Sequence, residues 1–412
     1  MEFEIEKEKD KMKKKGKRHL WMGFFLGIFV CLLGGFVYSA LGSFGILPWE
    51  REQTGAHALE TQRKLKSIER KISKYYLEEA DGQKMVDGLY RGYVSALGDP
   101  YSTYYNEKEY KAMNEEASGQ YKGIGIVMQQ DSKTGFVRVV RCYENTPSAR
   151  AGILVNDIIL KVNQKDVQGK DLSQIAMEIK KEGTKEVNLT IKREGKSKEI
   201  EFTLIPEAIE VPVVASKLLD SQIAYIQIAE FTEVTKSQFD NQWKKLKKEG
   251  ATRLIIDLRN NPGGLLSSVV DLVDEFLSDG DMIVYTEDKY KKRVELKAGK
   301  GKEIEVPLVV LVNENSASAS EIFAGAVKDH KLGTLVGSKT FGKGIVQQIF
   351  TLQDKSALKI TVSKYFTPNG NDIHKVGIVP DVEIKEEKQE KEKEVEEKDK
   401  ALEKAIEILE KK

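Results

Sequence analysis

Between Gln222 and Ile378 the sequence alternates short apolar runs with stretches of helical periodicity, and no other feature restricts the fold as strongly. The apolar runs are rich in Ile, Leu and Val, as buried strands are, and lie at residues 223–228, 253–258, 308–312 and 358–362. The helical stretches lie between them, at residues 237–248, 265–277 and 320–328. Strands that alternate with helices predict an α/β domain in which helices cover a mixed sheet.

The preceding region has a different pattern. From Tyr121 to Ile205, short β-like runs follow one another, with one helix-like stretch at residues 171–181. This pattern predicts a small β-rich domain. Three of its segments are distinctive: a glycine-containing turn that enters a strand, YKGIGI at 121–126, then PSARAGI at 147–153 and NDIILKVN at 156–163.

Together these segments resemble a PDZ domain, which we place at residues 118–207. The resemblance implies that one loop, made of Gly123, Ile124, Gly125 and Ile126, binds the C-terminus of a peptide. Such a loop can aim successive backbone N–H groups at a terminal carboxylate, and the adjacent strand edge can add the peptide as a further strand. The alternative is that the two glycines serve only a tight turn.

Residues 20–48 contain no charged side chain, and their apolar part, residues 20–47, is long enough to cross a bilayer core of roughly 30 Å as a helix. Lysines and an arginine crowd the sequence between Lys11 and Arg18. The positive-inside rule therefore predicts a single-pass cell-membrane protein, with residues 1–19 as a cytoplasmic basic tail and the rest outside the cytoplasm. The alternative is a cleaved signal peptide, which normally has a shorter apolar region.

Two helical segments flank the predicted domains. Residues 50–115 predict a helical N-terminal region, with amphipathic helices at 56–80 and 84–97. Residues 385–412 are dominated by Lys and Glu and end in an apolar stripe, which predicts a charged linker and an amphipathic helix. Because both segments lie outside the two evident domains, they are candidates for contacts in a homo-oligomer.

Charge and cysteine content exclude several classes of function. The chain has 66 basic and 65 acidic residues, so no bulk positive field indicates a nucleic-acid partner. Cys31 and Cys142 are not expected to form a disulfide, because Cys31 lies in the apolar segment. No cluster of Cys and His has zinc spacing, so we expect neither a metal nor a cofactor.

The segment from Asn313 to Gln348 carries the strongest chemical signal. Three serines, Ser316, Ser318 and Ser320, follow an apolar run and open a helix-like stretch. The sequence SASE at 318–321 fits a capping box, which places the serines at a strand-to-helix turn. The free N–H groups of a helix N-terminus can stabilise an oxyanion, so this turn suits a nucleophile. The alternative is that Ser318 only caps the helix.

A serine nucleophile needs a base, and Lys343 is one candidate. A lysine acts as a base only when its amine is neutral, which desolvation favours, and Lys343 lies between two glycines beside apolar residues. If the chain is extended there, Gln347 falls on the same side and could hold the amine. Two alternatives remain: a surface lysine without a role, and a Ser–His–Asp triad that uses His374 with Asp372 or another acid.

Several motifs together resemble the carboxyl-terminal processing proteases, the tail-specific serine peptidases of family S41. They occur in the family's order from the region before the PDZ-like domain to about residue 385. The motifs are LGDPYS at 97–102, DLRNNPGG at 257–264, SASASEIFAGA at 316–326, TFGKG at 340–344 and GIVPD at 377–381. One departure is Tyr101, where the family often has a histidine.

The resemblance assigns roles to particular residues. In the family the base lysine follows the nucleophilic serine by 25 residues, which selects Ser318 and Lys343. A glutamine four residues after the lysine is the family's third catalytic residue and matches Gln347. The resemblance also implies an oxyanion hole built from the N–H groups of Ala319 and of either Gly263 or Gly264.

These implications predict a membrane-anchored serine endopeptidase, with its protease domain at residues 208–384 and a PDZ domain inserted before it. We expect it to cleave extracytoplasmic proteins with a Ser–Lys dyad. The PDZ domain is expected to bind substrate C-termini and to gate the activity. The alternative is a membrane-surface PDZ adaptor with an inactive protease fold, against which the intact Ser318, Lys343 and Gln347 count.

Overall fold

The structure is a computed structural model that describes residues 58–181, 183–299, 301–384 and 399–411. The predicted basic tail and membrane anchor, residues 1–47, lie outside the described residues. Within the described part of the chain, no helix is both long and apolar enough to cross a membrane. The chain divides into two compact units, residues 1–86 and 87–412.

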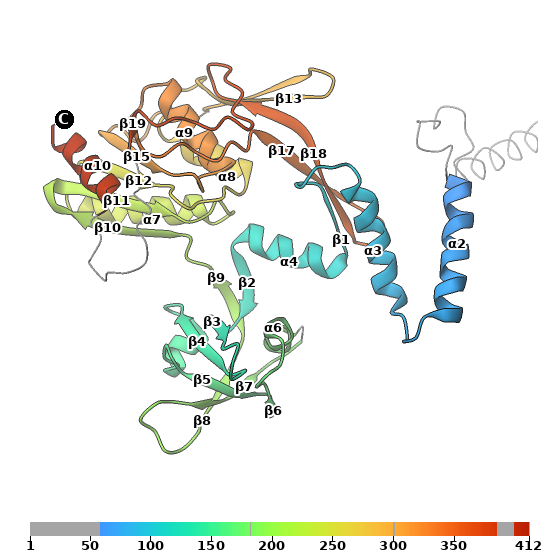
Figure 1. Ribbon diagram of the computed structural model, residues 1–412. Coiled ribbons are helices and arrows are strands. Elements are labelled where there is room, and N and C mark those ends of the chain that lie inside the picture. The colour runs from blue at the N-terminus through green and yellow to red at the C-terminus, as the bar shows by residue number, and fades with distance from the viewer. Residues whose placement is uncertain (1–57, 182, 300, 385–398, 412) are drawn as a thin grey trace, which may run out of the picture. The chain divides into compact units, whose positions relative to one another are not determined.

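The described part of the first unit contains helix α2, Ala58–Tyr75, and the start of α3, Gly82–Ser95 (Figure 1). Both helices agree with the helical N-terminal region predicted from the sequence. The apolar stripe of α2 is at least partly exposed: Ile68 is at 46% of full exposure, and Tyr76, just after the helix, is at 57%. Its amphipathic face is therefore not part of a hydrophobic core in the described chain.

A six-stranded mixed sheet forms the centre of the second unit, in the order β10–β11–β12–β15–β16–β19. The strands are Val214–Leu219, Ile223–Ile228, Arg253–Asp257, Leu308–Val312, Thr334–Gly337 and Val382–Glu383. Strand β10 runs antiparallel to β11, and the remaining pairs are parallel. The prediction of an α/β domain with a mixed sheet is confirmed.

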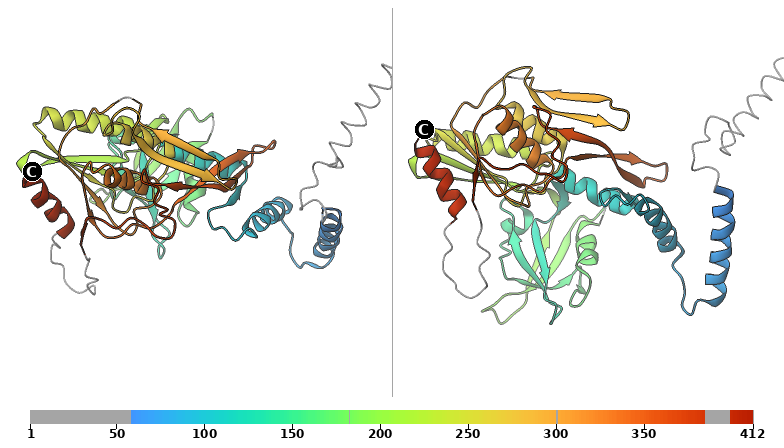
Figure 2. Two further views of the ribbon diagram at one scale, coloured as in Figure 1. Left: turned by 90° about the horizontal axis from the view of Figure 1, so that it is seen from above. Right: turned by 45° about the horizontal axis from the view of Figure 1, so that its top comes forward.

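Helices cover both faces of this core sheet. One face packs against α7, α8 and α9, which are Thr235–Lys248, Leu266–Asp274 and Ala319–Asp329. The other face packs against α10, Lys400–Glu410, which lies along β15 and β16 (Figure 2). Side chains alternate across a strand, so successive residues of β15 enter the two different cores.

The strand predicted at residues 358–362 is confirmed, but it does not belong to the core sheet. It is part of β18, Ala357–Phe366, which lies in a separate antiparallel sheet. The other strands there are β1, Thr103–Tyr105; β13, Met282–Asp288; β14, Arg293–Lys297; and β17, Ile345–Thr351. Because β1 and β17 both pair with β18, this sheet connects the start of the second unit with the segment that follows Lys343.

The predicted β-rich domain has its own sheet, built from β3 to β8, and its own apolar core. The strands are Ile126–Gln130, Val137–Cys142, Ile158–Val162, Lys165–Asp166, Val187–Lys192 and Ile200–Leu204. The helices are α5, Pro147–Ala151, and the predicted α6, Leu172–Lys180. A ladder between β2, Gln120–Gly123, and β9, Glu207–Glu210, closes the domain after α4, Glu107–Ser118.

Candidate active site

Ser318 occupies the turn between the buried strand β15 and helix α9. It is the N-cap of α9, and the predicted capping box with Glu321 is present. In that box the N–H of Ser318 donates to Oε2 of Glu321 at 2.9 Å. The serine therefore lies at the N-terminus of a helix, beside the backbone N–H groups of its first turn.

The backbone of Ser318 is strained, with φ 55° and ψ −113°. A non-glycine residue in such a conformation costs on the order of 1–3 kcal/mol and persists only where neighbouring contacts hold it. One such contact comes from the buried Tyr365, whose hydroxyl donates to the carbonyl oxygen of Ser318 at 3.0 Å. Strain of this kind concentrates at functional sites, which supports a chemical role for this serine.

The three serines of the turn have different environments. Ser316 and Ser320 are fully buried, and their hydroxyls donate to the carbonyl oxygens of Leu258 at 2.8 Å and Asn261 at 3.0 Å. These two serines therefore tie the turn to the neighbouring loop. Ser318 alone among the three is partly exposed, so it is the serine that a substrate can reach.

The fully buried carboxylate of Glu321 joins the serine turn to the lysine segment. Its Oε2 accepts from the backbone N–H of Ser318 and from that of Lys343 at 2.8 Å. Its Oε1 accepts from the backbone N–H of Gly342 at 2.7 Å and from the hydroxyl of Thr340 at 2.6 Å. The structure thus brings the backbones of the predicted nucleophile, Ser318, and of the predicted base, Lys343, to one carboxylate.

The amine of Lys343 is half buried and lies over the ring of Tyr101, with Nζ 4.6 Å from the ring centroid. Burial lowers the pKa of Lys343, and the positive charge of Lys359 lowers it further. Asp99 and Glu321 act in the opposite direction, but the net shift is downward. A lower pKa makes the neutral amine, which can accept a proton, more accessible.

Gln347 is placed on β17 near this lysine, but its side chain has another partner. Its amide donates to the hydroxyl of Thr361 on β18 at 3.3 Å. Among the hydrogen bonds of the described residues, none joins Gln347 to the amine of Lys343. The predicted role of Gln347 in holding the amine stays a prediction.

The alternative base, His374, is not held by Asp372 in the way that a Ser–His–Asp triad requires. In a triad the carboxylate accepts a hydrogen bond from the histidine ring. Here Asp372 accepts from the backbone N–H of His374 at 2.9 Å and forms an ion pair with Lys364. The ring Nδ1 of His374 is buried and has no hydrogen-bond partner among the described residues. Another histidine, His330, is the C-cap of α9, at the opposite end of that helix from Ser318. Its Nε2 is hydrogen-bonded to the carbonyl oxygen of Met282.

The predicted oxyanion loop approaches Ser318 closely. Gly263 has φ 107°, and a Cβ atom there would lie 2.8 Å from Cβ of Ser318 and 2.9 Å from the nitrogen of Ala319. Only glycine fits such an approach. The N–H of Gly263 already donates to Oδ1 of Asn261 at 2.8 Å. Among the hydrogen bonds of the described residues, none is donated by the N–H groups of Ala319 or Gly264.

The β-rich domain contains a groove of about 290 Å³ lined by residues of β3 and α6. Three residues of the predicted carboxylate loop, Gly123, Ile124 and Ile126, line it. Gly125 does not line the groove but turns the chain there, with φ 84°. The loop, the strand edge and the helix are therefore arranged as peptide binding at a sheet edge requires.

Comparisons with known proteins agree with this architecture. Three family models match: peptidase family S41 over residues 222–384, the PDZ domain over 122–204, and the N-terminal domain of the activating protease CtpB over 46–109. The carboxy-terminal processing protease CtpA of Bacillus subtilis is 36% identical over 360 residues, which cover 86% of this chain and 76% of the relative. The chain belongs to peptidase family S41 and is a carboxy-terminal processing serine peptidase.

Further relatives of this S41 peptidase include a probable CtpA-like serine protease of Staphylococcus saprophyticus, 33% identical over 88% of this chain and 73% of the relative. Among solved structures, the photosystem II D1 C-terminal processing protease is 28% identical, with a TM-score of 0.45. That match covers 78% of this chain and 86% of the other.

Two residues at the site of this S41 peptidase were not identified from the sequence. Glu321 reads as a helix cap, yet it also binds the segment from Thr340 to Lys343. The sequence predicts that Glu321, the last residue of SASE, takes part in a capping box. Nothing near it in the sequence indicated that it also accepts hydrogen bonds from residues 340–343. Tyr365, which holds the strained Ser318, carries no sequence signal because it comes from a strand of the second sheet.

Proposed function

We propose that this S41 peptidase is a membrane-anchored endopeptidase that cleaves extracytoplasmic proteins with Ser318 as nucleophile and Lys343 as base. The observation that carries the catalytic part is the shared Oε2 atom of Glu321, which holds the backbones of both residues. The strained conformation of Ser318 and the lowered pKa of Lys343 support the same assignment.

In the proposed reaction, the neutral amine of Lys343 takes the hydroxyl proton of Ser318 as Oγ attacks the carbonyl carbon of the substrate. The N–H groups of Ala319 and Gly264 donate to the resulting oxyanion. The ammonium of Lys343 then gives its proton to the leaving amine, and an acyl-enzyme remains. A water molecule, deprotonated by Lys343, then attacks the ester carbonyl, and the ammonium returns the proton to Oγ of Ser318 as the C–O bond breaks and the acid product leaves.

The PDZ domain is proposed to bind substrate C-termini and to gate cleavage. Lys180, at the end of α6, lines the peptide groove and lies 4.3 Å from the ring centroid of Tyr121. The same amine forms an ion pair with Glu115 of α4 at 3.1 Å. A peptide in the groove would contact Lys180 and compete with Glu115 for its amine. Peptide binding would thereby weaken the ion pair that joins the PDZ domain to α4.

The membrane location rests on the sequence. Residues 20–47 form an uncharged apolar segment preceded by a basic tail, which favours a retained anchor with the protease outside the cytoplasm. The test is fractionation of cells that express the full chain or a chain without residues 2–47. The proposal expects only the full chain in the membrane fraction, with its protease domain accessible to an externally added protease. A full chain in the soluble fraction would contradict it.

The catalytic proposal is tested with the full chain in detergent and a reporter peptide of free C-terminus. Cleavage should be lost in Ser318→Ala and in Lys343→Ala and retained in His374→Ala. If Lys343→Ala cleaves normally while His374→Ala is inactive, a Ser–His arrangement is correct instead. If all three variants cleave normally, the site is elsewhere.

A further inference from the structure

The C-terminal helix α10 is anchored at both ends. At its start, Asp399 caps the helix by accepting from the N–H of Leu402 at 3.0 Å. At its end, Glu410 accepts from the hydroxyl of Ser221 at 2.7 Å. Between the anchors, a face that includes Ala405 and Leu409 is buried against the core sheet. The helix is therefore an integral layer of the protease, although its sequence is dominated by charged residues.

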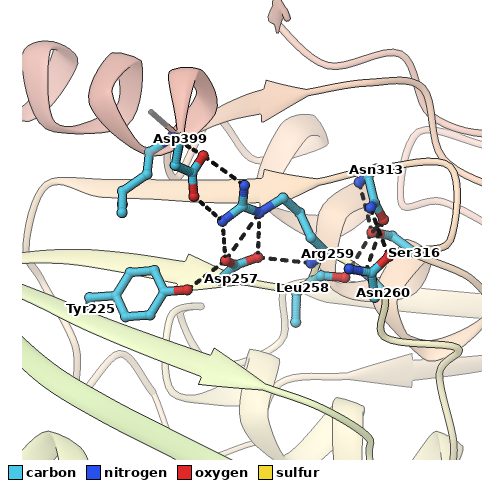
Figure 3. A network of polar contacts seen from close by, with 9 residues as sticks. Tyr225, Asp257, Leu258, Arg259, Asn260, Asn313, Ser316 and Asp399 are labelled. Carbon is cyan, nitrogen blue, oxygen red and sulfur yellow. Dashed lines mark hydrogen bonds and ion pairs between the residues drawn. The ribbon is translucent and has the colours of Figure 1, made fainter. Parts of the chain in front are cut away.

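The anchor at Asp399 extends beyond the helix to Arg259, two residues after the end of strand β12 (Figure 3). Both nitrogens of the guanidinium fork donate to the two oxygens of Asp399 at 2.8 Å. The same guanidinium also donates to the buried carboxylate of Asp257, with a shortest distance of 2.6 Å. The hydroxyl of Tyr225 donates to that carboxylate at 2.7 Å. Arg259 is thus fixed between two acids, only one of which belongs to the sheet.

Arg259 begins the loop that carries the oxyanion glycines. The next residue, Asn260, has φ 60° and exchanges side-chain and backbone hydrogen bonds with Asn313, next to the serine turn (Figure 3). Asn261 then binds Ile228 and Gly263 through its side chain. The ion pair at the start of α10 is therefore joined to the loop beside Ser318 through the backbone from Arg259 to Gly263, and side-chain hydrogen bonds hold Asn260 and Asn261 along it.

Burial alone would raise the pKa of Asp399, but Arg259 and the N–H of Leu402 more than offset it, and the net shift is downward. Asp399 is therefore ionised at neutral pH, where its contact with Arg259 is a bidentate ion pair. Such pairs fix geometry more strictly than single hydrogen bonds do, because the guanidinium plane and the carboxylate plane must coincide. The direction of the Arg259 side chain is thus set partly by the C-terminal helix.

We propose that Asp399 is a positioning residue for catalysis: by holding Arg259, it sets the position of the 260–264 loop, whose N–H group binds the oxyanion. The inference rests on the proposed function of Ser318 and of that loop. Asp399 itself does not touch the substrate. Its effect is therefore expected on the transition state, where the loop acts, and not on substrate binding.

The test uses Asp399→Asn in the full chain. Asparagine caps helices about as well as aspartate does, so this variant removes the ion pair and keeps the cap. The matched control is Glu410→Gln, which changes the other carboxylate anchor of the same helix, far in the network from the oxyanion loop. For each variant, kcat and KM for a reporter peptide, inhibition by a peptide aldehyde, and Tm are measured.

We expect Asp399→Asn to lower kcat by roughly ten- to a hundredfold, since small displacements of catalytic groups have effects of this size. KM should stay within about twofold of the wild-type value. The aldehyde forms a tetrahedral adduct whose oxygen occupies the oxyanion hole, so its Ki should rise by about the same factor as kcat falls. Glu410→Gln should leave all three quantities unchanged. Arg259→Lys, which loses the bidentate geometry, should behave like Asp399→Asn.

Three results would overturn the inference. One is wild-type kcat in Asp399→Asn, and another is an equal loss in Glu410→Gln. The third is a lower kcat with an unchanged aldehyde Ki, because that pattern reports fewer folded molecules and not a displaced loop. Ser318→Ala, measured in parallel, separates this failure from that of the proposed function: if it still cleaves, the assignment of the site itself is at fault.

Discussion

The backbone N–H groups of Ser318 and Lys343 donate to the same carboxylate oxygen of Glu321, at 2.9 and 2.8 Å. This relationship explains how two residues from separate segments keep a fixed distance. The carboxylate is fully buried and accepts four donors, so it has little freedom to turn. A buried charge with this many partners is satisfied only while both segments stay in place.

Replacement of Glu321 by Gln should therefore damage both activity and stability. A glutamine offers one acceptor oxygen and one NH₂ group, so in either orientation two of the four donors face another donor. We expect kcat/KM to fall by at least about tenfold and the free energy of unfolding to fall by about 2–4 kcal/mol, since hydrogen bonds to a charged group are each worth about 1.5–3 kcal/mol. Peptide cleavage and denaturant titration measure the two effects.

The control for this prediction is Glu314→Gln. Glu314 lies in the same loop, but it is exposed, and its side chain accepts a hydrogen bond from the hydroxyl of Ser338. This variant should match the wild type in both measurements. Wild-type cleavage in Glu321→Gln would show that the shared oxygen does not hold the site together.

The pH dependence of cleavage should report on Lys343. Because the base must be neutral, kcat/KM should rise with pH as the amine loses its proton, with a midpoint below the usual lysine value of about 10.4. Lys359 lowers the pKa of Lys343, so Lys359→Gln should raise that pKa and move the midpoint to higher pH. We expect a shift of a few tenths of a unit, because the charges interact through partly solvated surroundings.

Lys355→Gln is the matched control for this shift. Lys355 lies in the turn between β17 and β18 and pairs with Glu107, and it is not among the groups that act on Lys343. Its pH profile should coincide with that of the wild type. A midpoint that is the same in Lys359→Gln, or that moves to lower pH, would contradict the assignment of Lys343 as the titrating base.

Peptide binding to the PDZ domain should require a free carboxylate. The loop at residues 123–126 offers backbone N–H groups, so a peptide with an amidated C-terminus should bind at least about tenfold more weakly than the same peptide with a free acid. Gly125→Ala should weaken binding of the free acid as well, because the Cβ atom of the new alanine would lie 2.3 Å from the Cβ atom of Thr146. Fluorescence titration measures both. Equal affinity for acid and amide would exclude carboxylate recognition.

Gating through Lys180 should depend on its partner in α4. In Glu115→Gln the ion pair with Lys180 is lost. A peptide in the groove then has no ion pair to displace, so its effect on cleavage should become smaller. The measurement is the ratio of reporter cleavage with and without a saturating non-cleavable peptide of free C-terminus. In Glu115→Gln that ratio should move towards one. An unchanged ratio would show that the ion pair between Lys180 and Glu115 plays no part in gating.

The sequence predicts those parts of the fold that depend on local pattern. The buried runs at 223–228 and 308–312 are strands because apolar β-branched residues fill them, and the capping box at Ser318 and Glu321 is a local motif. The antiparallel sheet was missed because its strands are far apart in the sequence: β1 precedes the PDZ domain, whereas its partner β18 follows it. Most side chains of β14 and β17 are at least partly exposed, so they lack a strong apolar signal.

The candidate site divides in the same way. Ser318, Lys343 and the glycine loop follow from residue types and family spacing, and the structure brings the serine, the lysine's backbone and the loop together. Sequence spacing does not reveal the direction of a side chain. For this reason the sequence did not predict that Gln347 donates to Thr361. The proposed role of Asp399 could not be predicted from the sequence either. Asp399 lies in a Lys- and Glu-rich segment, and nothing in that segment indicates a contact with Arg259.

The most direct test of the central claim is mass-spectrometric mapping of the serine that reacts with a fluorophosphonate, together with the rate of that reaction. In the wild type we expect one adduct, on Ser318, and none on the buried Ser316 or Ser320. In Lys343→Ala the same adduct should form at least a hundredfold more slowly, because the hydroxyl has lost its base. An adduct on another residue, or an unchanged rate in Lys343→Ala, would contradict the assignment of the Ser318–Lys343 pair.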